Sequence, residues 1–323
     1  MPLSRRQALA AASLLLATGA AFAQAYPAKP IKVIVPFPAG GGTDLIAREV
    51  TSRVQASKGW SFVVENRPGT GGNIGIDAVA KSPADGYTIG LGQTSNLAIN
   101  PTLYKKMPYD SVKDLAPIGL VASAPLVLVV GETSPFKTLG EVVAAAKAKP
   151  GSLNMAFSGN GTVAHLASVL FQKSAGVEFT HVPYKGAAQA STDVVSGRVD
   201  LYLSSVPTLI GYIKNGKMRP IAVTSLKRVD DLPQVPTIAE SGVKDFEAVT
   251  WFGFVAPTGT PKDIVALLNA EFNKALQSPD VKKKLSDQGA DVLGGSPETF
   301  ATTIKNDLAR WAPIVKASGA TLD

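Results

Sequence analysis

The stretch IKVIVPFPAGGGTDLIAREV, residues 31–50, joins an apolar run to a helical pattern through three consecutive glycines. Residues 31–35 are mostly apolar and β-branched, which is typical of a buried strand. From Leu45 to Val54 the apolar side chains recur at helical spacing. A strand followed at once by a helix indicates an α/β protein, and glycines at that junction leave the backbone uncovered.

A helix start of this kind could hold an anion. The first turn of a helix carries unpaired N–H groups and a partial positive charge. Gly40, Gly41 and Gly42 would let a ligand approach these groups closely, so that a carboxylate or phosphate could bind there. Thr43 or Asp44 is expected to cap the helix. The alternative is a tight strand–helix turn that holds no ligand.

The strand–loop–helix alternation continues along the chain. Strands are expected at 62–64 and 87–91, and the second of them precedes a polar loop at 93–96. The run LVASAPLVLVV, residues 120–130, is too long for one ordinary strand. We interpret it as a strand that leaves one domain and enters another, and residues 251–255 resemble a second crossing strand.

Between the two crossings the alternation of strands and helices starts again. The expected strands there lie at 153–157, 179–182, 199–203 and 220–224, and the expected helices at 139–147, 162–171, 187–195 and 207–214. Helices at 261–276, 279–288 and 297–309 are expected to return to the first domain. Two such lobes, each a mostly parallel sheet flanked by helices, would enclose a cleft at the carboxyl ends of their strands, where open α/β sheets bind ligands.

Two further glycine-rich loops lie at such strand ends. ENRPGTGGNIG, residues 65–75, fails the dinucleotide-binding pattern because Ile74 stands where the third glycine belongs. FSGNGTVAHL, residues 157–166, satisfies G-x-G-x-x-A but does not open the first βαβ unit of its domain. A nucleotide is therefore one alternative, while Ser158, Thr162 and the amides around Gly161 could equally donate hydrogen bonds to a carboxylate.

Other side chains are candidates by their position alone. Each could contact a ligand or serve only packing and local hydrogen bonding; they are Phe37, His165, Tyr184, Asp200 and Ser204. The sequence contains neither the H-E-x-x-H zinc pattern nor a G-x-S-x-G nucleophile elbow. We therefore expect neither a metal nor a cofactor.

Composition excludes some classes of function. The chain has 323 residues and no cysteine, which rules out disulfides and thiolate chemistry. The formal charge is +7 and the pI is about 9.4, but Lys and Arg are scattered apart from the run at 282–284. We expect no nucleic-acid partner, because no basic stripe interleaved with aromatic residues occurs. A diffuse positive charge suits small acidic ligands.

The N-terminus has the pattern of an export signal. Arg5 and Arg6 precede an apolar stretch at 8–20, and Ala21-Phe22-Ala23 fits a signal-peptidase site. We expect cleavage near Ala23 and a periplasmic mature protein. The arginine pair also resembles part of a twin-arginine signal, so the export route stays open. No later segment is long and apolar enough to suggest a membrane span.

Taken together, the motifs resemble those of a known family. They are YPAKPIKVIVPFPAGGGTD, ENRPGTGG, SGNGTVAHL, VPYKGAAQASTDVVSGRVD, KMRPIAVTS, VPTIAESG and FEAVTWFGFVAP, in this order. The chain resembles the periplasmic solute-binding proteins of tripartite tricarboxylate transporters, the Bug or TctC-like family. The resemblance implies a two-lobed Venus-flytrap fold with two crossover strands, in which 24–123 plus 250–323 form lobe one and 124–249 form lobe two.

The resemblance also implies a function and a site. Such proteins capture a small organic acid between their lobes and deliver it, as monomers, to integral membrane subunits. The implied ligand-binding residues are Phe37, Ala39, Gly40, Thr43, Asp44, Ser95, Asn96, Ser158, Gly161, Thr162, His165, Tyr184, Asp200 and Ser204. The identity of the acid stays open. Two alternatives also remain: an exported hydrolase or lyase that acts on an organic acid, and a sensor component that presents its ligand to a membrane kinase.

Overall fold

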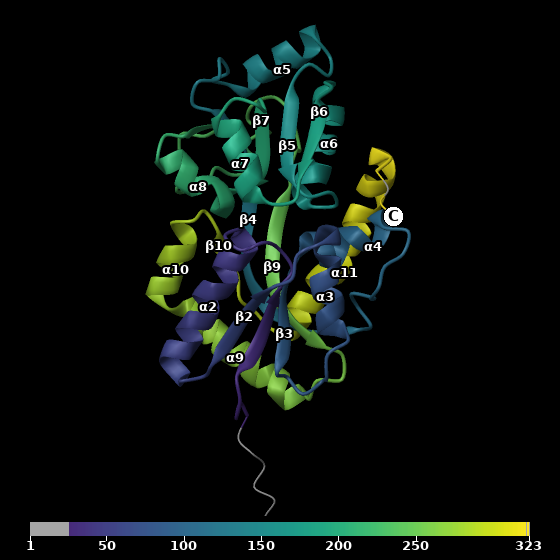
Figure 1. Cartoon of the computed structure of the whole chain (residues 1–323), viewed down its shortest axis with the longest axis vertical. Coiled ribbons are helices and arrows are strands. Elements are labelled where there is room, and N and C mark those ends of the chain that lie inside the picture. The colour runs from purple at the N-terminus through teal and green to yellow at the C-terminus, as the bar shows by residue number, and fades with distance from the viewer. Residues whose placement is uncertain (1–25, 321, 323) are drawn as a thin grey trace, which may run out of the picture.

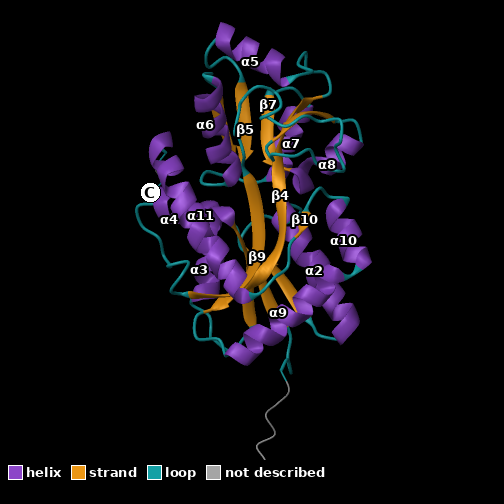
Figure 2. Cartoon of the chain, turned by 180° about the vertical axis from the view of Figure 1, so that it is seen from behind, coloured by secondary structure: helices purple, strands orange, loops and turns teal. Residues whose placement is uncertain are grey.

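The computed structural model describes residues 26–320 and 322, so the predicted signal at 1–23 and its cleavage site near Ala23 lie outside the described residues. The molecule is elongated and has two α/β lobes, and the long strands β4 and β9 run between them (Figure 1). The predicted fold class is confirmed. Helices flank the sheets of both lobes (Figure 2).

The first lobe is built on a mostly parallel sheet. Strand β1 (Ile31–Val35) pairs in parallel with β2 (Phe62–Asn66) on one side and β3 (Thr88–Gln93) on the other. Strand β9 (Val249–Pro257) runs antiparallel to β3. The helices of this part are α2 (Gly42–Lys58), α3 (Asn73–Ala80), α4 (Asn100–Leu103), α9 (Lys262–Gln277), α10 (Pro279–Ser286) and α11 (Pro297–Ser318).

Strand β4 (Leu115–Gly131) is the crossing strand that the long apolar run predicts. It pairs with β9 from Leu115 to Pro125, and from Leu126 onward it pairs with β7 (Leu201–Ser205) and β8 (Met218–Val223). The short strand β10 (Asp291–Val292) also pairs with β4. The change of partners falls between Pro125 and Leu126, two residues beyond the first of the lobe boundaries that we propose, 123/124, and β9 begins at Val249, beside the second, 249/250.

The second lobe repeats the α/β pattern. Strand β5 (Asn154–Ser158) lies in parallel between β6 (Thr180–Tyr184) and β7. The helices are α5 (Leu139–Ala148), α6 (Val163–Ala175), α7 (Ala187–Val195) and α8 (Val206–Lys214). Helix α11 is longer than the expected 297–309, and beyond lobe one it also contacts α6 (Figure 1).

The polar loop expected at 93–96 is not a loop. Strand β3 extends to Gln93, and the chain then enters a π-helical turn, Ser95–Ile99, whose residues are all buried. The short 3₁₀ turn Thr70–Gly72 follows β2 in the same region. The polar residues of 93–96 therefore lie inside the lobe, where they must satisfy one another's hydrogen bonds.

Both faces of the central strands are covered, which fixes the end of β1 in space. Val33 packs in one cluster with Val50 of α2 and Phe272 of α9. Ile34, on the opposite face, packs in another cluster with Ile76 of α3. Because burial of one such side chain contributes about 1.5–3 kcal/mol, the loop between β1 and α2 extends from a rigid base.

Candidate ligand-binding cavity between the lobes

A cavity of about 360 Å³ lies between the lobes and is lined from both of them. Most of its lining comes from the carboxyl ends of strands, the loops after them and the first turns of helices, and Leu126 and Thr250 come from the crossing strands β4 and β9. The walls comprise Phe37, Pro38, Ala39, Gly41, Gly42, Thr43, Gln93, Leu126, Ser158, Thr162, Val163, Ala164, Lys185, Gly186, Ala187, Ala188, Gln189, Ser204, Ser205, Thr208 and Thr250. Helices α2, α6, α7 and α8 all begin at this wall, so the positive ends of four helix dipoles meet there.

The glycine loop brings backbone N–H groups to this wall. Helix α2 begins at Gly42, and its N-cap residue, Gly41, makes no side-chain capping hydrogen bond. The prediction that Thr43 or Asp44 caps the helix is wrong, because Thr43 Oγ1 donates instead to Gln93 Oε1 (3.0 Å). Gly42 N donates across the seam between the lobes to Thr208 Oγ1 (3.2 Å). The start of α2 therefore makes a direct hydrogen bond to lobe two.

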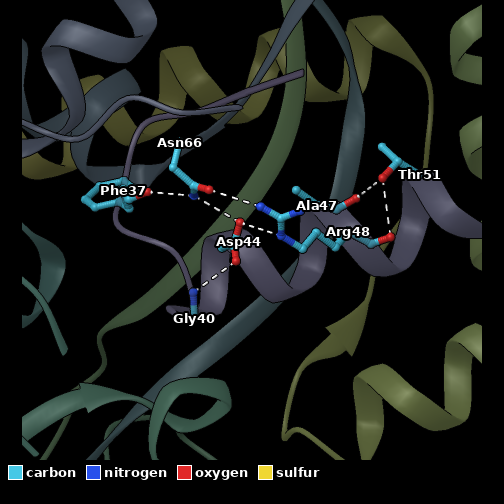
Figure 3. A network of polar contacts seen from close by, with 7 residues as sticks. All are labelled: Phe37, Gly40, Asp44, Ala47, Arg48, Thr51 and Asn66. Carbon is cyan, nitrogen blue, oxygen red and sulfur yellow. Dashed lines mark hydrogen bonds and ion pairs between the residues drawn. The ribbon is translucent and has the colours of Figure 1, made fainter. Parts of the chain in front are cut away.

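Asp44 braces the glycine loop from behind (Figure 3). Its carboxylate accepts hydrogen bonds from Gly40 N, Arg48 Nε and Asn66 Nδ2, each at 2.9 Å. Asn66 Nδ2 also donates to the carbonyl of Phe37 (3.0 Å). Burial raises the pKa of Asp44, but these hydrogen bonds and the Arg48 charge outweigh it and hold the pKa below its ordinary value. The ionised carboxylate thus fixes the loop.

A buried polar cluster forms the floor of the cavity in lobe one. Gln93 is 7% exposed and lines the cavity, and its Nε2 donates to Ser95 Oγ (3.0 Å). Asn96 Oδ1 accepts from the backbone N–H of Gln93 (3.0 Å). Ser95 and Asn96 are themselves fully buried. Their hydrogen bonds position Gln93, and Gln93 in turn orients the hydroxyl of Thr43.

The loop after β5 forms the facing wall. Thr162 caps α6: its hydroxyl accepts from His165 N (3.3 Å) and donates to the carbonyl of Gly159 (2.9 Å). Ser158 Oγ shares a short hydrogen bond with Tyr202 OH. Gly161 has a φ of +80° and lies against Leu103 and Asn100 of lobe one, so that it forms part of the seam rather than of the cavity.

His165 lies behind this loop. Its Nδ1 accepts from Gly161 N (3.3 Å), and its ring stacks on Phe157 with 4.7 Å between centroids. Burial first, and then the nearby His181, lower the pKa of His165 to about 4. The ring is therefore neutral near pH 7, as its acceptor role at Nδ1 requires.

Tyr184 and Asp200 lie outside the cavity. Tyr184 lines a neighbouring outer cleft of about 730 Å³, and its hydroxyl donates to Asp193 Oδ2 (2.8 Å). Burial and then Asp193 raise the pKa of Tyr184 to about 12. Asp200 Oδ2 accepts from Asn154 N (2.8 Å) where β5 and β7 begin. These strand starts are at the opposite edge of the sheet from the cavity.

The sequence-predicted residues thus divide into two sets. Those that line the cavity are Phe37, Ala39, Thr43, Ser158, Thr162 and Ser204. Those that lie behind it, at the seam or elsewhere are Gly40, Asp44, Ser95, Asn96, Gly161, His165, Tyr184 and Asp200. Ser205, which with Ser204 was expected at the end of a strand where ligand contacts belong, also lines the cavity. Sequence reasoning did not select Gln93, Lys185, Gly186, Thr208 and Thr250. For Thr208, the available signal was a hydroxyl directly after a Pro at the start of a helix.

The described part of the chain contains no group of three or more His, Cys, Asp or Glu side chains that could hold a metal ion. None of the helices of residues 26–320 is long and apolar enough to span a membrane.

The chain is similar to known proteins in sequence and in structure. Residues 46–320 match the family described as tripartite tricarboxylate transporter family receptor. A UPF0065 protein in the tcbD-tcbE intergenic region of Pseudomonas sp. strain P51 is 43% identical, over 97% of this chain and 94% of the relative. Protein BugT of Bordetella pertussis is 40% identical, over 93% and 92%. The solved structure of R. palustris Rpa4515 with adipate is 38% identical with a TM-score of 0.89, covering 92% of this chain and all of that one.

Proposed function

The chain belongs to the tripartite tricarboxylate transporter receptor family, and from this premise we propose that its interlobe cavity captures a small organic acid through one carboxylate. It is a periplasmic solute-binding protein that works with membrane transporter components, not an enzyme. The Rpa4515 relative was solved with adipate bound. We propose that this chain takes an acid of the same general kind, acts as a monomer without a nucleic-acid partner, and is processed near Ala23.

One observation carries the proposal: four helix starts and a set of hydroxyls converge on a cavity without acidic lining. Among the described residues, no Asp or Glu side chain lines it. An ionised carboxylate can only accept hydrogen bonds, so it needs donors. The backbone around Gly41 and Thr43 and the hydroxyls of Ser204 and Ser205 supply them from opposite lobes.

Capture would be coupled to closure of the lobes. The hydrogen bond from Gly42 N to Thr208 Oγ1 joins the lobes directly at the cavity wall. Closure excludes water, and hydrogen bonds to a charged group are less screened in a closed cleft. A ligand that contacts both lobes shifts the population toward the closed state by its difference in affinity for the two states. The loaded, closed form is then the form that membrane subunits would recognise.

A thermal-shift and calorimetric screen of organic acids tests this function. Succinate, glutarate, adipate, malate and benzoate provide a range of lengths, charges and shapes. At a hundredfold excess over its dissociation constant, a true ligand should stabilise the fold by about 2.7 kcal/mol. Mass spectrometry of the same mixtures should find the acid unchanged. A flat response to every acid, or formation of a product, would contradict capture of a carboxylate.

A further inference from the structure

Lys185 is the one charged side chain that the interlobe cavity and the outer cleft share. It lines both spaces, and no other Lys, Arg, Asp, Glu or His among the described residues lines either of them. Phe37, Pro38, Ser158 and Thr162 also line both, so the two spaces adjoin along this border. The whole region that a ligand could occupy therefore carries a single formal charge, which is positive.

Lys185 makes no ion pair or hydrogen bond through its side chain within residues 26–320. The neighbouring carboxylate of Asp193 does not neutralise it, because Tyr184 OH and Arg198 each contact that carboxylate at 2.8 Å. By contrast, Lys284 elsewhere on the surface pairs with an acid, Glu49. Lys185 is exposed, so its ammonium group remains free to meet a ligand.

The neighbours of Lys185 hold its backbone at the seam between the lobes. On one side, Tyr184 is anchored through Asp193 on α7. On the other side, Gly186 is the N-cap of α7, and a Cβ on it would lie 3.2 Å from Pro38 Cγ of lobe one. The backbone around Lys185 therefore abuts the loop that precedes α2. Only the flexible side chain has freedom to move toward either space.

We propose that Lys185 forms a second anionic subsite, which binds the distal negative group of a dianionic acid. This inference rests on the proposed function, in which the helix starts hold the first carboxylate. If backbone and hydroxyl donors hold the first carboxylate, the unpaired ammonium is left for another charge. Because Lys185 belongs to lobe two and abuts lobe one, an ion pair there would also favour closure.

The subsite should discriminate between acids by charge rather than by size. Adipate and its half-amide, adipamate, have the same chain length and nearly the same shape, but adipamate lacks the distal charge. The same relation holds for succinate with succinamate and glutarate with glutaramate. The wild-type protein should bind the diacid of at least one pair about fivefold more tightly than its half-amide, which corresponds to the upper range for an exposed ion pair.

The experiment is a calorimetric titration of these pairs into the wild type, Lys185→Gln, Lys185→Arg and Lys217→Gln. Lys217 is an exposed lysine of the same lobe outside both spaces, so Lys217→Gln makes the same change in net charge elsewhere. Lys185→Gln should abolish the preference for the diacid, because it weakens diacid binding more than half-amide binding. Lys185→Arg should retain the preference, and Lys217→Gln should behave as the wild type.

The outcomes separate this inference from the proposed function. Equal affinities of the wild type for diacid and half-amide would overturn the subsite but uphold capture of a carboxylate. An equal loss of affinity for diacid and half-amide in Lys185→Gln would also overturn the subsite and uphold capture of a carboxylate. A wild type that binds only monocarboxylates would lead to the same conclusion. Failure of the wild type to bind any acid, including benzoate, would overturn the proposed function itself. Higher salt should reduce the preference for the diacid in the wild type, since an exposed ion pair is screened.

Discussion

Replacing Gly42 by alanine should weaken ligand capture without harming the fold. A Cβ on Gly42 would lie 3.0 Å from Ser205 Oγ and 3.4 Å from both Pro207 Cβ and Thr208 Oγ1. All three neighbours belong to lobe two. The substitution therefore crowds the seam only when the lobes are together. In an open form, alanine is at least as good a helix former as glycine at the start of α2.

The size of the effect follows from the contact that is disturbed. Accommodating the methyl group requires a shift of a few tenths of an ångström, which lengthens the 3.2 Å hydrogen bond from Gly42 N to Thr208 Oγ1. A typical intramolecular hydrogen bond contributes about 0.5–1.5 kcal/mol. If the closed state loses that amount, the apparent dissociation constant should rise by about 2- to 12-fold.

Calorimetry with the best acid of the screen measures the loss, and thermal unfolding without ligand measures the fold. Gly211→Ala is the matched control: Gly211 lies on α8, the helix that carries Thr208, and a Cβ there meets no atom within 4 Å. It should retain wild-type affinity and gain up to about 1 kcal/mol of stability. An unchanged affinity in Gly42→Ala would contradict this prediction. A fall in the free energy of unfolding large enough to explain the whole loss of affinity would contradict it as well.

Three further predictions concern the seam and the loops behind it. Thr208→Val removes the acceptor of the Gly42 N–H and should raise the dissociation constant by a factor similar to Gly42→Ala; an unchanged value in calorimetry would argue against an interlobe bond. Asp44→Asn should lower the free energy of unfolding by about 1–2 kcal/mol near pH 7. The depressed pKa of Asp44 gives a contribution that is present above the unfolded value of 3.8 and lost as pH falls, so urea unfolding of variant and wild type should converge in strong acid. His165 has a pKa lowered from 6.5 to about 4, so the unfolded chain binds the proton first, and stability should fall as pH drops through this range. His165→Asn should flatten that slope, whereas an unchanged slope would assign it to other groups.

The local part of this architecture could be predicted from the sequence. A β-branched run, three glycines and a helical period in immediate succession leave few arrangements for residues 31–58. The length of the apolar run that contains Pro125 identified the crossing strand β4 in the same way. Both conclusions depend on neighbours in the chain, which is why they needed no knowledge of the tertiary structure.

The parts of the site that join distant segments could not be predicted. Thr208 meets Gly42 across 166 positions of sequence, and nothing near either residue indicates the other. Asp44 looked like a cap because of its place in the first turn, but Arg48 and Asn66 direct its carboxylate back toward the loop. Small errors in strand boundaries also matter. Strand β7 covers Leu201–Ser205 rather than 199–203, which puts Ser204 within the strand near its carboxyl end.

A structure of the protein with its acid bound would show directly whether both lobes hold the carboxylate. We expect a carboxylate inside the interlobe cavity, with its oxygens about 2.7–3.2 Å from donors of the loop that precedes and begins α2 and, at the same time, from hydroxyls of lobe two. An acid that contacts only one lobe, or that lies outside the cavity lined by Thr43, Thr162 and Ser204, would contradict it.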